Sequence, residues 1–293
     1  MDIVCNNATH GEAYAAYLGD CVSVVSQFPD ECIDFSVYSP PFGSLFVYSD
    51  SALDMGNSSS DGEFSEHYSF LVREKFRVTR QGRLTAVHCS DLPMKKWKDG
   101  AVGIRDFSGH IIRIHQDAGW IFHSRRTIWK CPVVEMTRTK HVGLLYKQLK
   151  KDSAKSRGGM PDYLLTFVKP GENQSPISHT PEDFPVEQWQ EWASPVWMTV
   201  DQTNVLNVKT ARSENDEKHL CPLQLDVIAR ALVMWSNPGD TVLSPFMGIG
   251  SEGYESLRAK RRFIGVELKE AYWKQAVNNL NGAAAQSDMF NVA

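Results

Sequence analysis

Short apolar runs alternate along the chain with segments in which apolar residues recur every three or four positions. The runs are bounded by Gly, Pro and Asp and predict buried strands at 15–18, 33–38, 83–88, 120–129, 163–168, 241–243 and 263–267. The helical spacing predicts helices at 21–28, 64–78, 107–118, 222–235, 251–259 and 269–280. Strands that alternate with helices are typical of a doubly wound, mostly parallel α/β sheet, and we expect a Rossmann-like fold in one domain, 1–293.

Three segments lack either pattern. Residues 43–64 are small and polar, include Ser58-Ser59-Ser60, and predict a mobile loop that can act as a lid. Residues 171–201 hold several prolines and three tryptophans, which we expect to pack an irregular excursion. Residues 281–293 predict a frayed end.

Composition narrows the class of protein. Of 293 residues, 42% are hydrophobic and 23% charged, which is ordinary for a folded enzyme and excludes collagen-like, coiled-coil and wholly disordered chains. No apolar run approaches the ~20 residues of a membrane span, and no secretory signal is visible, so we expect no membrane contact. The six cysteines form no CxxC pair, which predicts reduced thiols and a cytoplasmic location. The nine histidines show no metal-binding spacing, and we expect no metal.

A glycine-rich turn follows the apolar run at 241–243. The sequence Thr-Val-Leu-Ser-Pro-Phe-Met-Gly-Ile-Gly-Ser-Glu-Gly ends at Gly253 and predicts a strand, a tight loop and a helix start, where the backbone can approach a ligand. Glu267 ends the next predicted strand and is placed to accept hydrogen bonds from both hydroxyls of a ribose. An ordinary strand-to-helix turn is the simpler interpretation.

A dinucleotide site is a second interpretation, because Gly248, Gly250 and Gly253 satisfy GxGxxG. Two features argue against it. Glu252 lies in the first helical turn, where a pyrophosphate favours an unopposed positive dipole, whereas a sulfonium and an ammonium tolerate a carboxylate. A dinucleotide domain also begins with its fingerprint, but here only one predicted strand and helix follow it.

Ser39-Pro40-Pro41-Phe42 comes directly after the predicted strand 33–38. The two prolines fix the backbone and remove two amide donors. A rigid set of acceptors remains, formed by the Ser39 hydroxyl and the neighbouring carbonyls, with an aromatic face beside it. This arrangement suits an exocyclic amino group on a planar base, since such a group donates two hydrogen bonds and the base can stack on Phe42. A strand that ends in a diproline turn is the structural alternative.

Basic residues gather in one tract. Between 138 and 157 seven Lys or Arg residues and one acid give a local charge of +6, although the chain carries −4. Such clustering is what phosphate contacts require, and the alternative is a solvated helix face. The basic residues are Arg138, Lys140, Lys147, Lys150, Lys151, Lys155 and Arg157.

The chain resembles the exocyclic-amino DNA methyltransferases. Ser39-Pro-Pro-Phe42 is similar to their catalytic motif and Ser244-Pro-Phe-Met-Gly-Ile-Gly250 to their cofactor motif. The catalytic motif comes first, which is the order of the permuted β group. Gly19-Asp20 resembles the adenine-contacting turn of that group, 218–225 the segment before the cofactor motif, and 263–267 the ribose-binding strand.

The resemblance implies a sequence-specific methyltransferase of double-stranded DNA that uses S-adenosyl-L-methionine, encoded by a bacterium or a phage and often part of restriction-modification. It implies a catalytic set of Ser39, Pro40, Pro41 and Phe42. It implies a cofactor set of Asp20, Cys21, Ser39, Pro222, Ser244, Pro245, Phe246, Gly248, Gly250 and Glu267. The seven basic residues are the expected DNA contacts, and 131–162 and 172–215 the expected recognition elements. A monomer or a homodimer is expected.

The sequence departs from the family's pattern at two positions, and the first of them leaves the target base open. Ser39 stands where many members have Asp or Asn, and Ser-Pro-Pro is associated with cytosine N4, so we favour cytosine N4 over adenine N6. Ser244 stands where the family often has Asp. A covalent intermediate is not expected, because Ser39 occupies the place of the cysteine that cytosine C5 methylation needs. The target base must leave the duplex to reach such a pocket. Methylation of RNA, protein or a small molecule, and an NAD-dependent oxidoreductase, remain alternatives.

Overall fold

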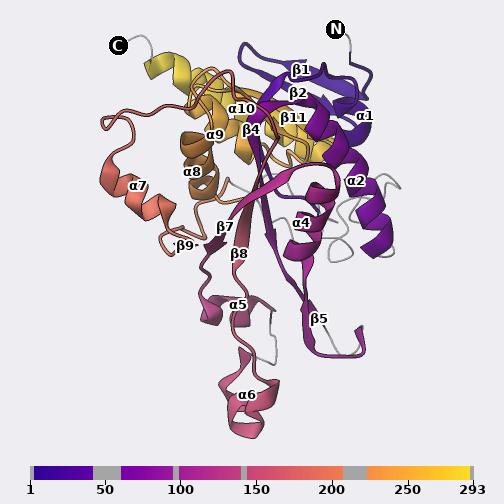
Figure 1. Cartoon of the computed structure of the whole chain (residues 1–293), viewed down its shortest axis with the longest axis vertical. Helices are drawn as coiled ribbons and strands as arrows, with labels where there is room; N and C mark the ends of the chain where they lie inside the picture. Colours follow the sequence, from indigo (N-terminus) through magenta and orange to yellow (C-terminus); the bar gives the residue numbers. More distant parts are fainter. Residues whose placement is uncertain (1–2, 42–60, 95–98, 140–143, 207–222, 291–293) are drawn as a thin grey trace.

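One mixed sheet organises the part of the chain that the computed structural model describes, which is 3–41, 61–94, 99–139, 144–206 and 223–290 (Figure 1). The strand order is β1-β2-β11-β10-β3-β4-β8-β7-β9. Five neighbouring strands run parallel: β2 (Tyr14–Leu18), β11 (Arg262–Glu267), β10 (Thr241–Ser244), β3 (Ile33–Tyr38) and β4 (Thr79–Ser90). The predicted doubly wound, mostly parallel fold is therefore confirmed.

Four further strands complete the sheet at its two sides. β1 (Asn7–His10) pairs antiparallel with β2 at one edge. On the other side β8 (Asp162–Val168) runs antiparallel to both β4 and β7 (Ile121–Ile128), and β9 (Val196–Trp197) lies parallel to β7. Because β8 reverses direction, its first residue lies at the edge where the parallel strands end.

Helices cover both faces of the sheet (Figure 1). α8 (Leu225–Trp235), α9 (Ser251–Arg258) and α10 (Glu270–Phe290) pack one core against β2, β3, β10 and β11. α1 (Cys21–Val25), α2 (Asp61–Val78) and α4 (Phe107–Asp117) pack the second core on the opposite face. Each core is built from the apolar face of amphipathic helices, as the helical spacing of the sequence requires.

Segments inserted at the ends of strands project from this core. α5 (Pro132–Thr139), α6 (Tyr146–Lys151) and the 3-10 turn η3 (Ser153–Lys155) lie between β7 and β8 and form an arm beyond the sheet (Figure 1). β5 (Leu92–Met94) and β6 (Gly103–Arg105) form a small antiparallel pair after β4. α7 (Val186–Ala193) precedes β9 within the Trp-rich excursion.

The structure corrects the prediction of a frayed end at 281–293 as far as Phe290, and 291–293 lie outside the described residues. α10 continues to Phe290, because Leu280 and Ala283 are fully buried in the first core and the Tyr14 hydroxyl donates to Asn281 Oδ1 at 2.7 Å. These contacts stabilise helical turns for which the sequence offers few apolar residues.

Two other expectations also change. The predicted loop 43–64 overlaps α2, which begins at Asp61; the remainder of that loop lies outside the described residues. Of the three tryptophans expected to pack, Trp197 is buried and Trp192 half-buried against Phe184, but Trp189 is 54% exposed.

Candidate functional site

The candidate site lies at the carboxyl edge of the parallel strands. Ser39 follows β3, Ser244 ends β10, Glu267 ends β11 and Asp20 follows β2. Because these strands are parallel neighbours, their carboxyl ends meet at one edge. The crossovers reverse between β10 and β3, which is the switch point where open α/β sheets bind ligands.

The two motifs that the sequence separates by about two hundred residues are in contact here. The ring of Tyr38, directly before Ser39, lies 5.8 Å from the ring of Phe246 between their centroids. Pro40 is buried and Ser39 half-buried beside it. The structure therefore places Tyr38, the residue before Ser39, against Phe246, whereas Phe42 lies outside the described residues.

The glycine loop takes a backbone shape that favours glycine. Gly248 and Gly250 have φ of 55° and 88°. The Gly250 amide donates to the Met247 carbonyl, and the Met247 amide donates to the Val266 carbonyl, both at 2.8 Å. These bonds tie the loop to β11, so that the loop and the end of β11 form one unit.

Glu267 belongs to the same unit. Its Oε2 accepts from the Gly248 amide at 2.8 Å, and its Oε1 accepts from the Lys269 amide at 2.9 Å. The sequence predicted only a ribose contact for this carboxylate, and the structure adds the role of bracing the loop.

Asp20 and Cys21 also have structural partners. Asp20 caps α1, where its Oδ1 accepts from the Ser23 amide at 2.8 Å. Cys21 is buried, and its burial raises the pKa of its thiol well above the ordinary value. Both residues lie at the edge that holds Glu267, since the Gly19 amide donates to the Glu267 carbonyl at 2.9 Å.

Two serine hydroxyls beside the glycine loop are buried without a hydrogen-bond partner among the described residues. They are those of Ser244, at the end of β10, and Ser251, the first residue of α9. The N-cap of α9, Gly250, has no side chain to satisfy the first amides of the helix. The buried polar groups of this loop therefore lack hydrogen-bond partners among the described residues. Buried groups of this kind are typical of a site where a polar ligand supplies the missing partners.

Glu252 introduces a carboxyl group at the same place. It is only 4% exposed, and burial raises its pKa from 4.5 to about 8, with a further contribution from Glu267. Among the described residues, no cationic side chain raises or lowers its pKa. A buried carboxyl group without a cation beside it favours a ligand that brings positive charge.

Ser39 has partners that the sequence did not predict. Its Oγ lies 3.0 Å from His88 Nδ1 and 3.2 Å from the His88 carbonyl oxygen, either of which can accept its one proton. His88 Nε2 in turn lies 3.2 Å from Asp162 Oδ2. The sequence suggests only a structural role for His88, because no histidine motif surrounds it and only the pairing of β4 with β8 brings Asp162 to it.

The predicted DNA contacts divide into two groups. Lys147, Lys150 and Lys151 are exposed on α6 in the projecting arm. Arg157 is instead only 11% exposed and pairs with Glu135 at 2.9 Å, which ties the arm together. Lys155 pairs with Asp152 at 3.0 Å on the surface.

Besides Phe42, three predicted residues cannot be placed by their side chains. Lys140 and Pro222 lie outside the described residues, and Arg138 is described only by its backbone in α5. In the ranges that are described, no His, Cys, Asp and Glu side chains group so as to hold a metal ion. None of the helices in those ranges is long and apolar enough to cross a bilayer.

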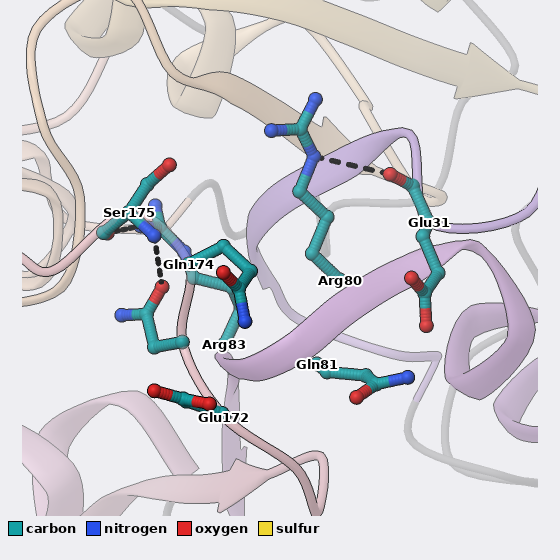
Figure 2. A pocket seen from close by; sticks show the side chains of 8 residues that line it. Glu31, Arg80, Gln81, Arg83, Glu172, Gln174 and Ser175 are labelled. Atoms are coloured by element: carbon teal, nitrogen blue, oxygen red, sulfur yellow. Dashed lines mark hydrogen bonds between the residues drawn. The ribbon is translucent and has the colours of Figure 1, made fainter.

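A cavity of about 350 Å³ lies at the opposite edge of the sheet, where the parallel strands begin (Figure 2). Its lining includes Glu31, Arg80, Arg83 and Glu172, so that opposite charges balance within it. Arg80 donates to the Glu31 carbonyl at 3.0 Å, as Figure 2 shows. None of the predicted site residues lines this cavity.

Comparisons with known proteins agree with the geometry. A sequence model of the DNA methylase family matches residues 33–278. The DNA adenine methyltransferase YhdJ of Escherichia coli K12 is 28% identical over 284 residues, covering 94% of this chain and 85% of YhdJ. The type II methyltransferase M.Cfr9I of Citrobacter freundii is 34% identical over 293 residues, covering 90% and 86%.

Solved structures show the same fold. TTHA0409 of Thermus thermophilus, in complex with S-adenosyl-L-methionine, superposes with a TM-score of 0.66 at 19% identity and covers 92% of this chain and 95% of its own. The cytosine-N4-specific PvuII DNA methyltransferase superposes with a TM-score of 0.65 at 16% identity, covering 96% of both chains. The chain therefore belongs to the family of N6- and N4-type DNA methylases, which transfer a methyl group from S-adenosyl-L-methionine to an exocyclic amine of DNA.

Proposed function

We propose that this enzyme methylates N4 of cytosine in double-stranded DNA, on a base turned out of the helix. The observation that carries the proposal is the neutral hydroxyl of Ser39 at the carboxyl end of β3, next to Tyr38, whose ring packs against Phe246 of the glycine loop. Charged acceptors bind an amine more strongly than neutral ones, so the choice of a hydroxyl affects which base is favoured. Ser-Pro-Pro at this place supports cytosine.

The residues at the edge of the sheet fit S-adenosyl-L-methionine. The unpartnered hydroxyls of Ser244 and Ser251 and the open amides of α9 suit its carboxylate, and Glu252 suits its positive charge. Glu267 would hold the ribose, and Asp20 and Phe246 would border the adenine. When bound, the cofactor supplies a methyl group on a cationic sulfur. These roles are inferred from chemistry and position.

The protein's own part in the reaction is positioning. Ser39 and the Pro40 carbonyl would accept both hydrogens of the target amine, which draws the nitrogen toward tetrahedral geometry and directs its lone pair at the methyl group. Pro40 and Pro41 hold these acceptors rigid, since their backbone φ is fixed. Phe42 is proposed to stack on the base. The base must be flipped, because this edge cannot reach a stacked nucleotide.

Transfer of label from S-adenosyl-L-methionine to duplex DNA, followed by mass spectrometry of the nucleosides, tests the proposal. Label in N4-methylcytosine is the expected result. Label in N6-methyladenine would show that the target base is adenine, the base named for YhdJ, and not cytosine. Absence of label in any duplex, with the cofactor bound, would contradict the proposal.

Replacing Ser39 by Ala is expected to reduce the methylation rate by about 100-fold, because one positioned hydrogen bond to the reacting group is lost. Single-turnover rates on duplex DNA measure this effect. Ser69→Ala is the matched control, because Ser69 bonds only within α2, to the Glu66 carbonyl, and should keep the full rate. Equal methylation rates for both variants would show that Ser39 has no part in catalysis.

We further propose that the α6 arm contacts DNA phosphates. Neutralising Lys147, Lys150 and Lys151 together should weaken duplex binding and lower the slope of log affinity against log salt by up to about 3, near 0.9 for each lost contact. Titrations of duplex DNA at several salt concentrations measure the slope. Lys274→Ala serves as control, because Lys274 lies on α10 and pairs with Glu270. An unchanged slope would place the DNA elsewhere.

A further inference from the structure

Four neighbouring strands place a row of polar side chains at the carboxyl edge of the sheet. Ser39 follows β3, His88 lies on β4, Asp162 begins β8 and Lys130 follows β7. Ser39 Oγ lies 3.0 Å from His88 Nδ1, His88 Nε2 lies 3.2 Å from Asp162 Oδ2, and Lys130 Nζ donates to Asp162 Oδ1 at 2.5 Å. The row therefore connects the proposed catalytic hydroxyl to a buried carboxylate.

Asp162 is charged in this row. Burial raises the pKa of its carboxyl group, but His88 and Lys130 together lower it to about 2. His88 Nε2 is buried and lies 3.2 Å from Asp162 Oδ2, at ion-pair distance but outside hydrogen-bond geometry to any described residue.

The carboxylate decides where the His88 proton resides. An anion beside Nε2 favours the tautomer with hydrogen on Nε2, which leaves Nδ1 as an acceptor. Nδ1 can then accept the Ser39 hydroxyl proton, and the lone pairs of Ser39 Oγ turn toward the exposed side of the edge. An oxygen whose proton is engaged elsewhere is a better acceptor for an amine.

We propose that His88, held by Asp162, orients the Ser39 hydroxyl and accepts its proton as the methylated amine loses one. The inference rests on the proposed role of Ser39 and deepens it. His88 and Asp162 do not touch the base in this arrangement, so they are positioning residues that act through Ser39.

The proton balance of the step is complete. The amine nitrogen forms a bond to the methyl carbon while the carbon–sulfur bond breaks and its electron pair stays on sulfur. The nitrogen becomes cationic and gives one proton to Ser39 Oγ, whose own proton passes to His88 Nδ1. The imidazolium that forms lies against the Asp162 carboxylate, which stabilises it.

Other charged groups lie around this row, and the variants that test it must leave those residues unchanged. Asp91, Asp106 and Arg125 act with Asp162 on the buried thiol of Cys89, next to His88. The burial of Cys89 raises the pKa of its thiol well above the ordinary value, so this thiol remains neutral. On the Ser39 side Tyr38 is buried, and its burial raises the pKa of its hydroxyl.

The test compares His88→Asn and Asp162→Asn with wild type. Asn at 88 can still bond to Ser39 but cannot take up its proton. We expect single-turnover methylation to fall by about 100-fold in His88→Asn. His123→Asn is the control, since His123 Nδ1 also lies near a hydroxyl, that of Thr166 at 3.2 Å, toward the other end of β7.

A double-mutant cycle separates the proposed role from a structural one. If His88 acts through Ser39, adding His88→Asn to Ser39→Ala should cost no further rate. Additive losses would overturn the inference. Cofactor affinity and melting temperature are measured for every variant, and Asp162→Asn replaces His88→Asn if the latter fails to fold. Wild-type transfer to DNA tests the proposed function separately.

Discussion

Replacing Glu252 by Gln is expected to stabilise the folded protein at alkaline pH and to leave its stability at acid pH unchanged. The carboxyl group is buried at the start of α9, and burial, aided by Glu267, raises its pKa from 4.5 to about 8. In the unfolded chain the group ionises near its ordinary pKa. Folding at neutral pH therefore requires Glu252 to take up a proton.

The sign follows from this proton uptake. The contribution of Glu252 is fully favourable below about pH 4.5 and is lost as pH rises toward about 8. Gln is neutral at every pH and has nearly the same shape, so it removes this loss. At about 1.4 kcal/mol for each pH unit the whole shift corresponds to at most about 5 kcal/mol.

Melting temperatures at about pH 5 and about pH 9 measure the effect. Glu255→Gln is the matched control on the same helix, because Arg258 pairs with Glu255 at 2.9 Å and offsets part of its desolvation. If the Glu252→Gln variant and wild type have the same melting temperature at both pH values, the carboxyl group is not buried as described. If S-adenosyl-L-methionine brings its positive charge here, it should stabilise wild type more than Glu252→Gln at about pH 9.

Local pattern determined much of the fold. The strand 33–38 was predicted with the bounds that β3 has, since a run of buried residues ends there at a proline. Predicted bounds for α9 and β11 differ from the observed ones by a single residue, because Gly250 and Glu267 delimit them. Such signals lie within a few residues of the element that they bound.

The row from Ser39 to Lys130 could not be predicted in this way. It depends on the antiparallel pairing of β4 with β8, which places Asp162 opposite Ser90 and close to His88. No spacing in the sequence encodes that register, and His88 alone has no motif. The same holds for Arg157, which clusters with lysines in sequence but pairs with Glu135 in space.

The other large effect is expected for Arg83→Met, at the edge of the sheet remote from the site. Arg83 is 1% exposed, and its guanidinium donates to the Asp34 carbonyl at 2.9 Å, to the Ser175 carbonyl at 2.8 Å and to the Asp240 carboxylate. Met fills similar volume but removes a donor from two carbonyls and the cation from the Asp240 carboxylate, whose Oδ2 still accepts from the Asn237 amide at 2.7 Å. Breaking a buried ion pair from one side costs about 3–5 kcal/mol.

Arg80→Met is the comparison that makes this prediction specific, because both arginines line the same cavity (Figure 2). Arg80 is 48% exposed and lies 3.4 Å from Asp34, and exposed pairs contribute at most about 1 kcal/mol. Denaturant unfolding followed by tryptophan fluorescence gives both free energies. Equal losses in the two variants would mean that water reaches Asp240 when Arg83 is absent. A loss confined to Arg83→Met is expected, because the Arg83 side chain joins two neighbouring strands. It contacts Asp240, which precedes β10, and Asp34, which lies in β3. The far ends of these two strands hold Ser244 and Ser39.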